Sequence, residues 1–106
     1  MAGRTGADRT PAGAFAAVGD RWCFRGDLNF DDAMPVLAAA ADLPLPASGV
    51  VDLAGLARGD SSALAVLFAL RRRAQAEGHR ALSFPGIPPA LLALARAYGV
   101  DGVLAG

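Results

Sequence analysis

This chain of 106 residues is poor in the side chains that build most catalytic and metal sites. It has a single cysteine, Cys23, and a single histidine, His79, so neither an internal disulfide nor a zinc site made of Cys and His is available. Lysine is absent, because all 10 basic residues are arginine, and this excludes a lysine-bearing phosphate loop. The lone thiol indicates a reducing compartment, and we expect no metal and no cofactor.

Net charge and long apolar runs are also missing. The formal net charge is zero, so no basic field is present to attract nucleic acid without sequence preference. The longest apolar run, 63–70, is far shorter than the roughly 20 residues that cross a bilayer. The first ten residues lack the apolar core of a signal peptide. We therefore expect a cytoplasmic protein that does not insert into a membrane and reaches one only through a partner.

What the chain does contain is enough apolar sequence for one folded domain. Hydrophobic residues make up 54% of the chain, which excludes disorder for its body, and its length leaves no room for a second domain. Residues 1–12, rich in Gly, Arg and Thr, predict a flexible N-terminal tail, and 13–106 predict the domain. Arginine in place of lysine, together with abundant alanine, indicates a GC-rich bacterial genome.

After the tail, the residue pattern alternates between strands and helices. Short apolar or β-branched stretches bounded by turn residues predict strands, and longer periodic stretches predict helices. The expected strands are 13–18, 21–25, 49–53 and 80–84, the expected helices are about 31–41, 60–77 and 88–98, with 54–59 as a loop and 100–104 as a short terminal element. This order is typical of crossover connections and indicates an α/β fold with a partly parallel sheet.

The start of the first helix depends on a proline. Asn29 and Asp31 are both suitable as N-terminal caps. Pro35 lies inside this stretch, and proline is tolerated only near the start of a helix because it lacks the N–H that later positions need. We therefore expect the regular helix to begin nearer Asp31 or Asp32 than Asn29.

Few residues offer a route to catalysis. Asp52, in the expected strand 49–53, has the chemistry of a general base, yet no histidine or second carboxylate is obviously placed beside it. His79 follows Gly78 at an expected helix end, where a solvated imidazole facing the helix dipole is commonplace. A small enzyme that uses Asp52 or His79 is therefore a distant alternative, which a substrate-sized polar pocket around either residue would support.

The turn at Asp60, Ser61 and Ser62 is the most informative segment. Asp and Ser are preferred N-caps because their oxygens accept the free backbone N–H groups of a helix start. The simpler interpretation is therefore a helix cap. The functional interpretation is that Ser61 lies exposed at the positive end of the helix, where a phosphate would be stabilised.

Helical spacing divides the following helix into two opposite faces. One face is apolar, spans about 60 degrees at about 100 degrees per residue, and is predicted to be buried. It consists of Ala63, Leu67, Leu70 and Ala74. The opposite face, which we call the outer stripe, consists of Ser61, Ala65, Phe68 and Arg72. Aromatic residues and arginine are enriched at protein interfaces, so the outer stripe predicts a partner-binding surface.

Three stretches resemble the STAS family. Residues 49–68 (GVVDLAGLARGDSSALAVLF) resemble its signature of a strand, an Asp-Ser turn and a Leu-rich helix, and 25–28 resemble the end of its early strand. Residues 82–100 (LSFPGIPPALLALARAYGV) resemble the MlaB-like branch, the small cytoplasmic subunits of the bacterial phospholipid (Mla) ABC transporter that maintains outer-membrane lipid asymmetry. The resemblance covers residues 13–105.

The resemblance implies a fold and a surface. It implies the STAS fold, with a mixed, mostly parallel sheet of about four to five strands and three to four helices. It also implies a regulatory or assembly subunit that is not an enzyme and binds the transporter's MlaF-like ATPase subunit, peripheral to the inner membrane. The docking residues would be Arg58, Asp60, Ser61, Ser62, Ala65, Phe68 and Arg72.

A second function stays open within the same family. In the related anti-sigma factor antagonists, the serine directly after the aspartate is phosphorylated by a partner kinase to break a complex, and that position is Ser61 here. In the transporter branch the position serves the ATPase contact, and phosphorylation is not implied. Ala63 stands where most members have glycine, and Gly59 stands where a larger apolar residue is usual. Both departures weaken the case for recognition by an anti-sigma factor kinase.

Overall fold

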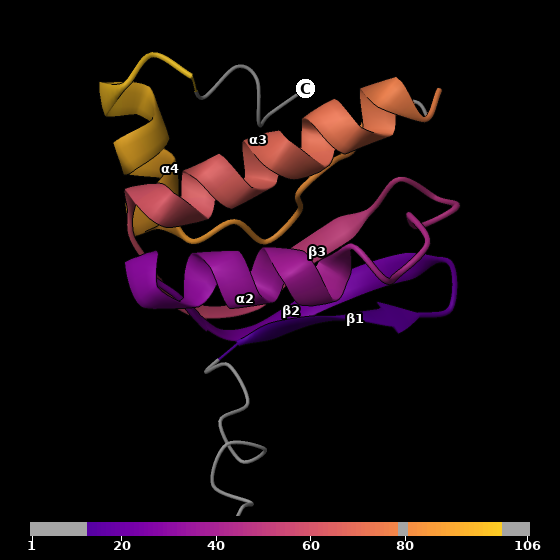
Figure 1. Ribbon diagram of the computed structural model, residues 1–106. Coiled ribbons are helices and arrows are strands. Elements are labelled where there is room, and N and C mark those ends of the chain that lie inside the picture. The colour runs from indigo at the N-terminus through magenta and orange to yellow at the C-terminus, as the bar shows by residue number, and fades with distance from the viewer. Residues whose placement is uncertain (1–12, 79–80, 101–106) are drawn as a thin grey trace, which may run out of the picture.

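The computed structural model describes residues 13–78 and 81–100. The tail expected at 1–12, His79 and most of the terminal element expected at 100–104 lie outside the described residues. The described elements, in chain order (Figure 1), are β1 (Ala14–Val18), β2 (Arg21–Leu28), α2 (Phe30–Ala40), β3 (Val51–Gly59), α3 (Ser61–Ala76) and α4 (Pro89–Ala97).

The sheet confirms the expected mixed α/β architecture, and it has three strands within residues 13–78 and 81–100. Its order is β1-β2-β3; β1 pairs antiparallel with β2, and β2 pairs parallel with β3. Where the fourth strand was expected, the described chain forms a single parallel bridge between Val50 and Ser83. Pro85 contributes only its carbonyl oxygen, which accepts from the Leu53 N–H at 2.8 Å. Because proline has no N–H to donate, regular pairing does not continue past this point.

β3 is longer than the expected strand 49–53, and the expectation of a loop at 54–59 is wrong. β2 also runs further, to Leu28, and its end pairs with the end of β3, where Leu28 lies opposite Gly59. Gly55 lies at an irregularity in the register, where an added Cβ would lie 2.4 Å from the Phe24 carbonyl oxygen. This glycine permits a close approach between strands instead of forming a turn.

α2 begins earlier than expected, with Asn29 as its N-cap and Phe30 as its first residue. The Asn29 N–H donates to Asp32 Oδ2 at 3.2 Å, which is half of a capping box. Pro35 therefore lies inside the helix. Its missing N–H removes one bond to the Asp31 carbonyl, in the exposed first turn, where water is available to replace it.

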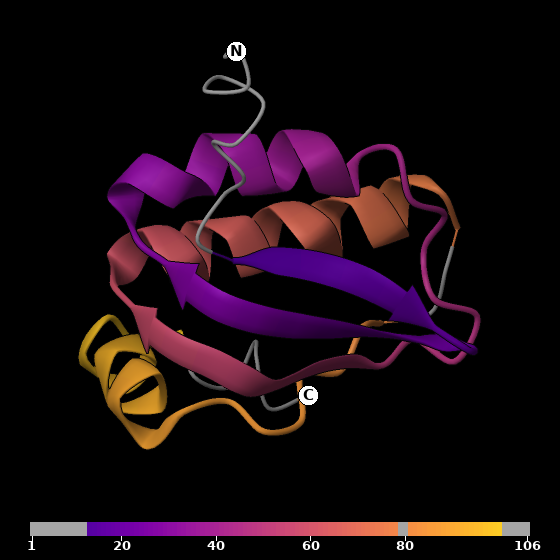
Figure 2. The ribbon, with the colours of Figure 1, turned by 90° about the horizontal axis from the view of Figure 1, so that it is seen from below.

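The core lies between the sheet and α2 and α3, which cover one face, while α4 packs beside α3 (Figure 2). Trp22 and Phe24 share the covered face of β2, as their parity predicts, and both are buried. The expected buried face of α3 is confirmed. Leu64 and Val66 are buried as well, because α3 is flanked by neighbours on both sides. No described helix covers the other face of the sheet. No helix in the described parts has the length and apolar character of a membrane span.

Candidate docking surface

Asp60 joins the beginnings of two helices. It follows directly after β3 and is the N-cap of α3, where its Oδ1 accepts from the Ser62 N–H at 2.8 Å. Its Oδ2 accepts from the N–H of Phe30, the first residue of α2, at 3.1 Å. One carboxylate therefore satisfies a free donor of each helix and lies at the positive end of both dipoles. Asp60 is therefore the helix cap that the sequence predicts, and it also caps α2, which begins 30 residues earlier in the chain.

Ser61 is placed differently from its neighbours. It is the first residue of α3 and is exposed, whereas Asp60 and Ser62 are half-buried. Its hydroxyl makes no hydrogen bond to any residue in the described part of the chain. The segment therefore presents one exposed, unshared hydroxyl at the start of a helix, beside a carboxylate whose oxygens are both engaged.

The outer stripe points away from the sheet over most of its length. Ser61, Ala65 and Arg72 are exposed, whereas Phe68 is half-buried and packs against the core. Phe68 lies one turn after the buried Leu64, so its ring extends from the stripe toward that side of the helix. The stripe reaches about 16 Å along α3 at about 1.5 Å per residue.

Arg58 completes the set of residues expected at this site. It is exposed near the end of β3, opposite Asp27 in the register, and lies two residues before Asp60. The structure thus places Arg58, Asp60, Ser61 and Ser62 where the end of β3 meets the start of α3. Arg72 lies apart from them, toward the other end of the helix.

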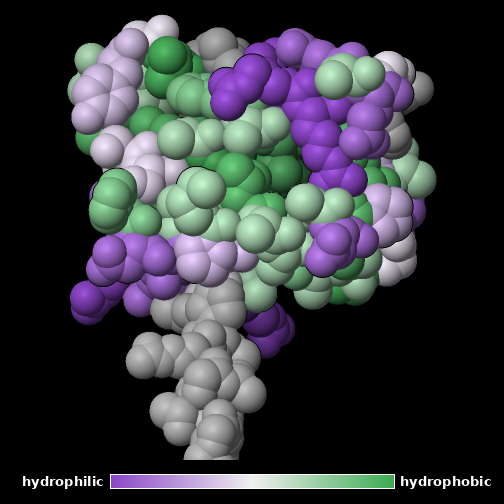
Figure 3. Space-filling model, viewed as in Figure 1, coloured by the Kyte–Doolittle hydropathy of each residue, from purple (hydrophilic) through white to green (hydrophobic). Residues whose placement is uncertain are grey.

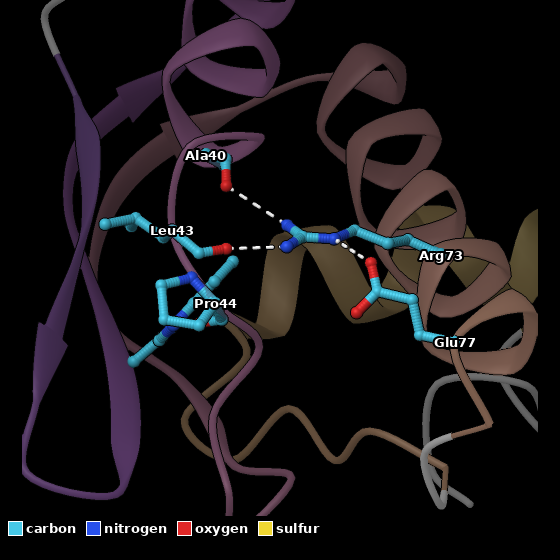
Figure 4. A network of polar contacts seen from close by, with 6 residues as sticks. Ala40, Leu43, Pro44, Arg73 and Glu77 are labelled. Carbon is cyan, nitrogen blue, oxygen red and sulfur yellow. Dashed lines mark hydrogen bonds and ion pairs between the residues drawn. The ribbon is translucent and has the colours of Figure 1, made fainter.

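Arg73 has a role that sequence reasoning missed (Figure 4). Its Nη1 donates to the Ala40 carbonyl oxygen at 3.1 Å and its Nη2 to that of Leu43 at 2.6 Å. Its Nε donates to Glu77 at 2.9 Å, and its guanidinium carbon lies 5.9 Å from the centroid of the Trp22 ring. The positively charged guanidinium thus donates to free carbonyl oxygens at the end of α2, where the helix dipole is negative. Asp60 and Arg73 together hold α2 against α3 at both ends.

Sequence reasoning also missed two apolar side chains on α2. Phe30 is 76% exposed and Met34 is 74% exposed. Phe30 begins the helix tied to Asp60, so this apolar surface lies next to the start of α3. Their spacing of four residues, out of phase with the buried Val36 and Ala40, was the available signal.

Asp52, the other acidic candidate, lies on the open face of the sheet. Its Oδ2 pairs with Arg21 at 3.3 Å and its Oδ1 accepts from the Ala54 N–H at 2.8 Å. A shallow hollow of about 450 Å³ does lie beside it; its lining residues are Cys23, Phe24, Arg25, Asp52, Ala54 and Gly55. Among the described residues, this lining includes no histidine and no second carboxylate to form an acid–base pair with Asp52. Within the described ranges, no cluster of His, Cys, Asp and Glu is suited to a metal ion.

The chain is a small α/β domain. Its candidate site lies where β3, a parallel strand, ends and α3 begins. The family model described as MlaB, STAS domain matches residues 24–105, which is most of the chain. The chain therefore belongs to the STAS domain family and to its MlaB-like group. A comparison with curated proteins finds no match.

Proposed function

We propose that this chain is a non-catalytic STAS subunit that binds the ATPase subunit of a bacterial phospholipid ABC transporter and regulates or stabilises it. The family match supports a regulatory STAS role. The observation that carries the proposal is the exposed, unshared hydroxyl of Ser61 at the start of the outer stripe. In this proposal the protein is cytoplasmic and reaches the inner membrane through its partner.

The chemistry of the stripe suits a protein partner. The carboxylate of Asp60 is engaged within the domain, whereas the Ser61 hydroxyl is exposed and available to a partner. Ala65 has no side chain beyond Cβ, so a partner backbone is able to approach α3 closely there. Phe68 and Arg72 add apolar area and a cation, and aromatic residues and arginine are enriched at protein interfaces.

A phosphorylation-switched anti-sigma factor antagonist is the second candidate. The exposed Ser61 hydroxyl favours it, because a kinase needs access to the oxygen and a helix start stabilises a phosphate. The carboxylate of Asp60 opposes it, since a phosphate on the next residue adds about two negative charges beside an existing one. Phosphorylation of Ser61 by a partner kinase, detected by mass spectrometry, together with absence of binding to the ATPase subunit, would favour this candidate.

The proposal is tested by calorimetric titration of the purified transporter ATPase subunit. Ser61→Asp is expected to abolish measurable binding, because an unpaired charge would be removed from water at a cost of several kcal/mol. Ser61→Ala is expected to weaken binding less, by about tenfold, since it deletes one hydrogen bond. Ser83→Asp is the matched control, because Ser83 is an exposed serine at the opposite end of β3. Unchanged affinity for a folded Ser61→Asp protein would contradict the proposal.

A further inference from the structure

α2 carries a continuous apolar side that points toward α3 and solvent. Phe30, Met34, Leu37 and Ala41 fall within a sector of about 60 degrees at about 100 degrees per residue. Leu37 and Ala41 face α3, because both line a hollow between the two helices. Phe30 and Met34 continue the same side toward the start of the helix, where they are largely exposed. The apolar surface thus leads along α2 into the hollow.

The hollow between the helices has the size of one large apolar side chain. Its volume is about 200 Å³, and it is lined by Leu37, Ala41, Ala69, Leu70 and Arg73. For scale, a cavity of about 150 Å³ lined by apolar side chains binds benzene. Two of the lining residues are alanines, whose small side chains leave the space open. Figure 3 shows hydrophobic surface running between α3 and α2, with hydrophilic surface over the C-terminal half of α3.

The hollow is formed before any partner arrives. Asp60 ties the beginning of α2 to the beginning of α3, and Arg73 ties the end of α2 to the last third of α3. The separation of the helices is therefore set at both ends. A partner that uses this hollow avoids the cost of ordering it, which is the advantage of a preorganised surface.

We propose that the same ATPase subunit fills this hollow with a bulky apolar side chain of an amphipathic helix that lies along α2 and α3. This inference rests on the proposed function, because it names the element by which that partner binds. Two helices side by side form a groove that a third helix fits, with its apolar residues as anchors. Arg72 is exposed beside the groove and makes no ion pair with any described residue, so the partner helix carries a carboxylate at that end.

Two variants test the groove by different means. Met34→Glu places a charge on the exposed apolar side, and Ala69→Leu fills the hollow without adding charge. Each is expected to lower the affinity for the ATPase subunit by at least about tenfold in calorimetric titration. Ala39→Glu is the matched control, because Ala39 is an exposed residue of α2 that lies about 140 degrees around the helix from Met34. It is expected to leave the affinity within about twofold, and thermal unfolding checks that all three variants fold.

The outcomes separate this inference from the proposed function. One outcome is that Ser61→Asp loses binding while Met34→Glu and Ala69→Leu both keep full affinity. This result would contradict a partner helix in the groove and would leave the proposed function intact. No binding of the wild-type chain would overturn both. Sedimentation velocity gives a further check: a wild-type dimer that Met34→Glu converts to a monomer would assign the hollow to a second copy of this chain and overturn the inference.

Discussion

Asp60 and Asp52 are both half-buried aspartates of the segment that carries the family resemblance, yet their carboxylates do different work. Asp60 accepts backbone N–H groups from two helices that are far apart in sequence. Asp52 accepts from a residue two positions away and pairs with an arginine whose side chain is 49% exposed. The comparison teaches that the neighbours decide the role. One carboxylate assembles the proposed docking surface, and the other makes a solvent-screened pair on an open sheet face.

The largest effect should follow from removing the double cap. Asp60→Ala leaves the Phe30 N–H of α2 and the Ser62 N–H of α3 without their acceptor, and one cap is worth about 0.5–2 kcal/mol. We expect the free energy of unfolding to fall by about 2–3 kcal/mol, measured by urea denaturation. Asp60→Asn, which keeps a single acceptor oxygen, should cost about half as much. Equal stability of Asp60→Ala and wild type would show that the two bonds do not hold the helices together.

The next effect should come from the other end of α2. Arg73→Ala removes the donors to the carbonyls of Ala40 and Leu43, and we expect a loss of about 1–2 kcal/mol in the same measurement. Arg72→Ala is the control, since Arg72 is the exposed neighbour and should change stability by less than about 0.5 kcal/mol. Equal stability of the two variants would show that the bonds from Arg73 to the end of α2 do not stabilise the fold.

A smaller effect on stability is expected at Phe68. Loss of a fully buried phenylalanine costs about 3–5 kcal/mol, but Phe68 is half-buried, so Phe68→Ala should cost only about 1 kcal/mol. The affinity of the folded variant for the ATPase subunit should also fall, by more than this loss in the free energy of unfolding accounts for. A thermal midpoint that collapses in the variant would place Phe68 in the core and remove it from the outer stripe.

The smallest effect is expected on the open face. Asp52→Ala removes an ion pair that is screened by solvent, and exposed pairs of this kind contribute about 0–1 kcal/mol. We expect a change of less than about 1 kcal/mol in urea denaturation. If Asp52→Ala lowered the free energy of unfolding as much as Asp60→Ala, the two carboxylates would contribute equally to stability, which contradicts this account.

The parts that were predictable depend on local pattern. The buried face of α3 followed from apolar periodicity, and the role of Asp60 as its cap followed from residue type and position. The MlaB-like resemblance was confirmed by the family match. The docking residues themselves stay a prediction.

The parts that were missed depend on residues distant in sequence. The bond from Phe30 to Asp60 and the bonds from Arg73 to the end of α2 join segments about 30 residues apart, and no local pattern specifies them. The local pattern predicts Gly55 in a loop, because a glycine that permits close strand approach has the same local signature as one in a turn. Pro35 disfavours a helix that begins at Asn29, but the structure tolerates the proline because the carbonyl that loses its donor, that of Asp31, belongs to an exposed residue.

The central claim is that the start of α3, and not the open sheet face, is the surface that binds a partner. The most direct measurement is the affinity of the transporter ATPase subunit for Ser61→Asp and for Asp52→Ala, titrated in parallel with both proteins shown to be folded. The account predicts that binding is lost in Ser61→Asp and kept within about twofold of wild type in Asp52→Ala. Binding that survives Ser61→Asp and fails in Asp52→Ala would contradict it.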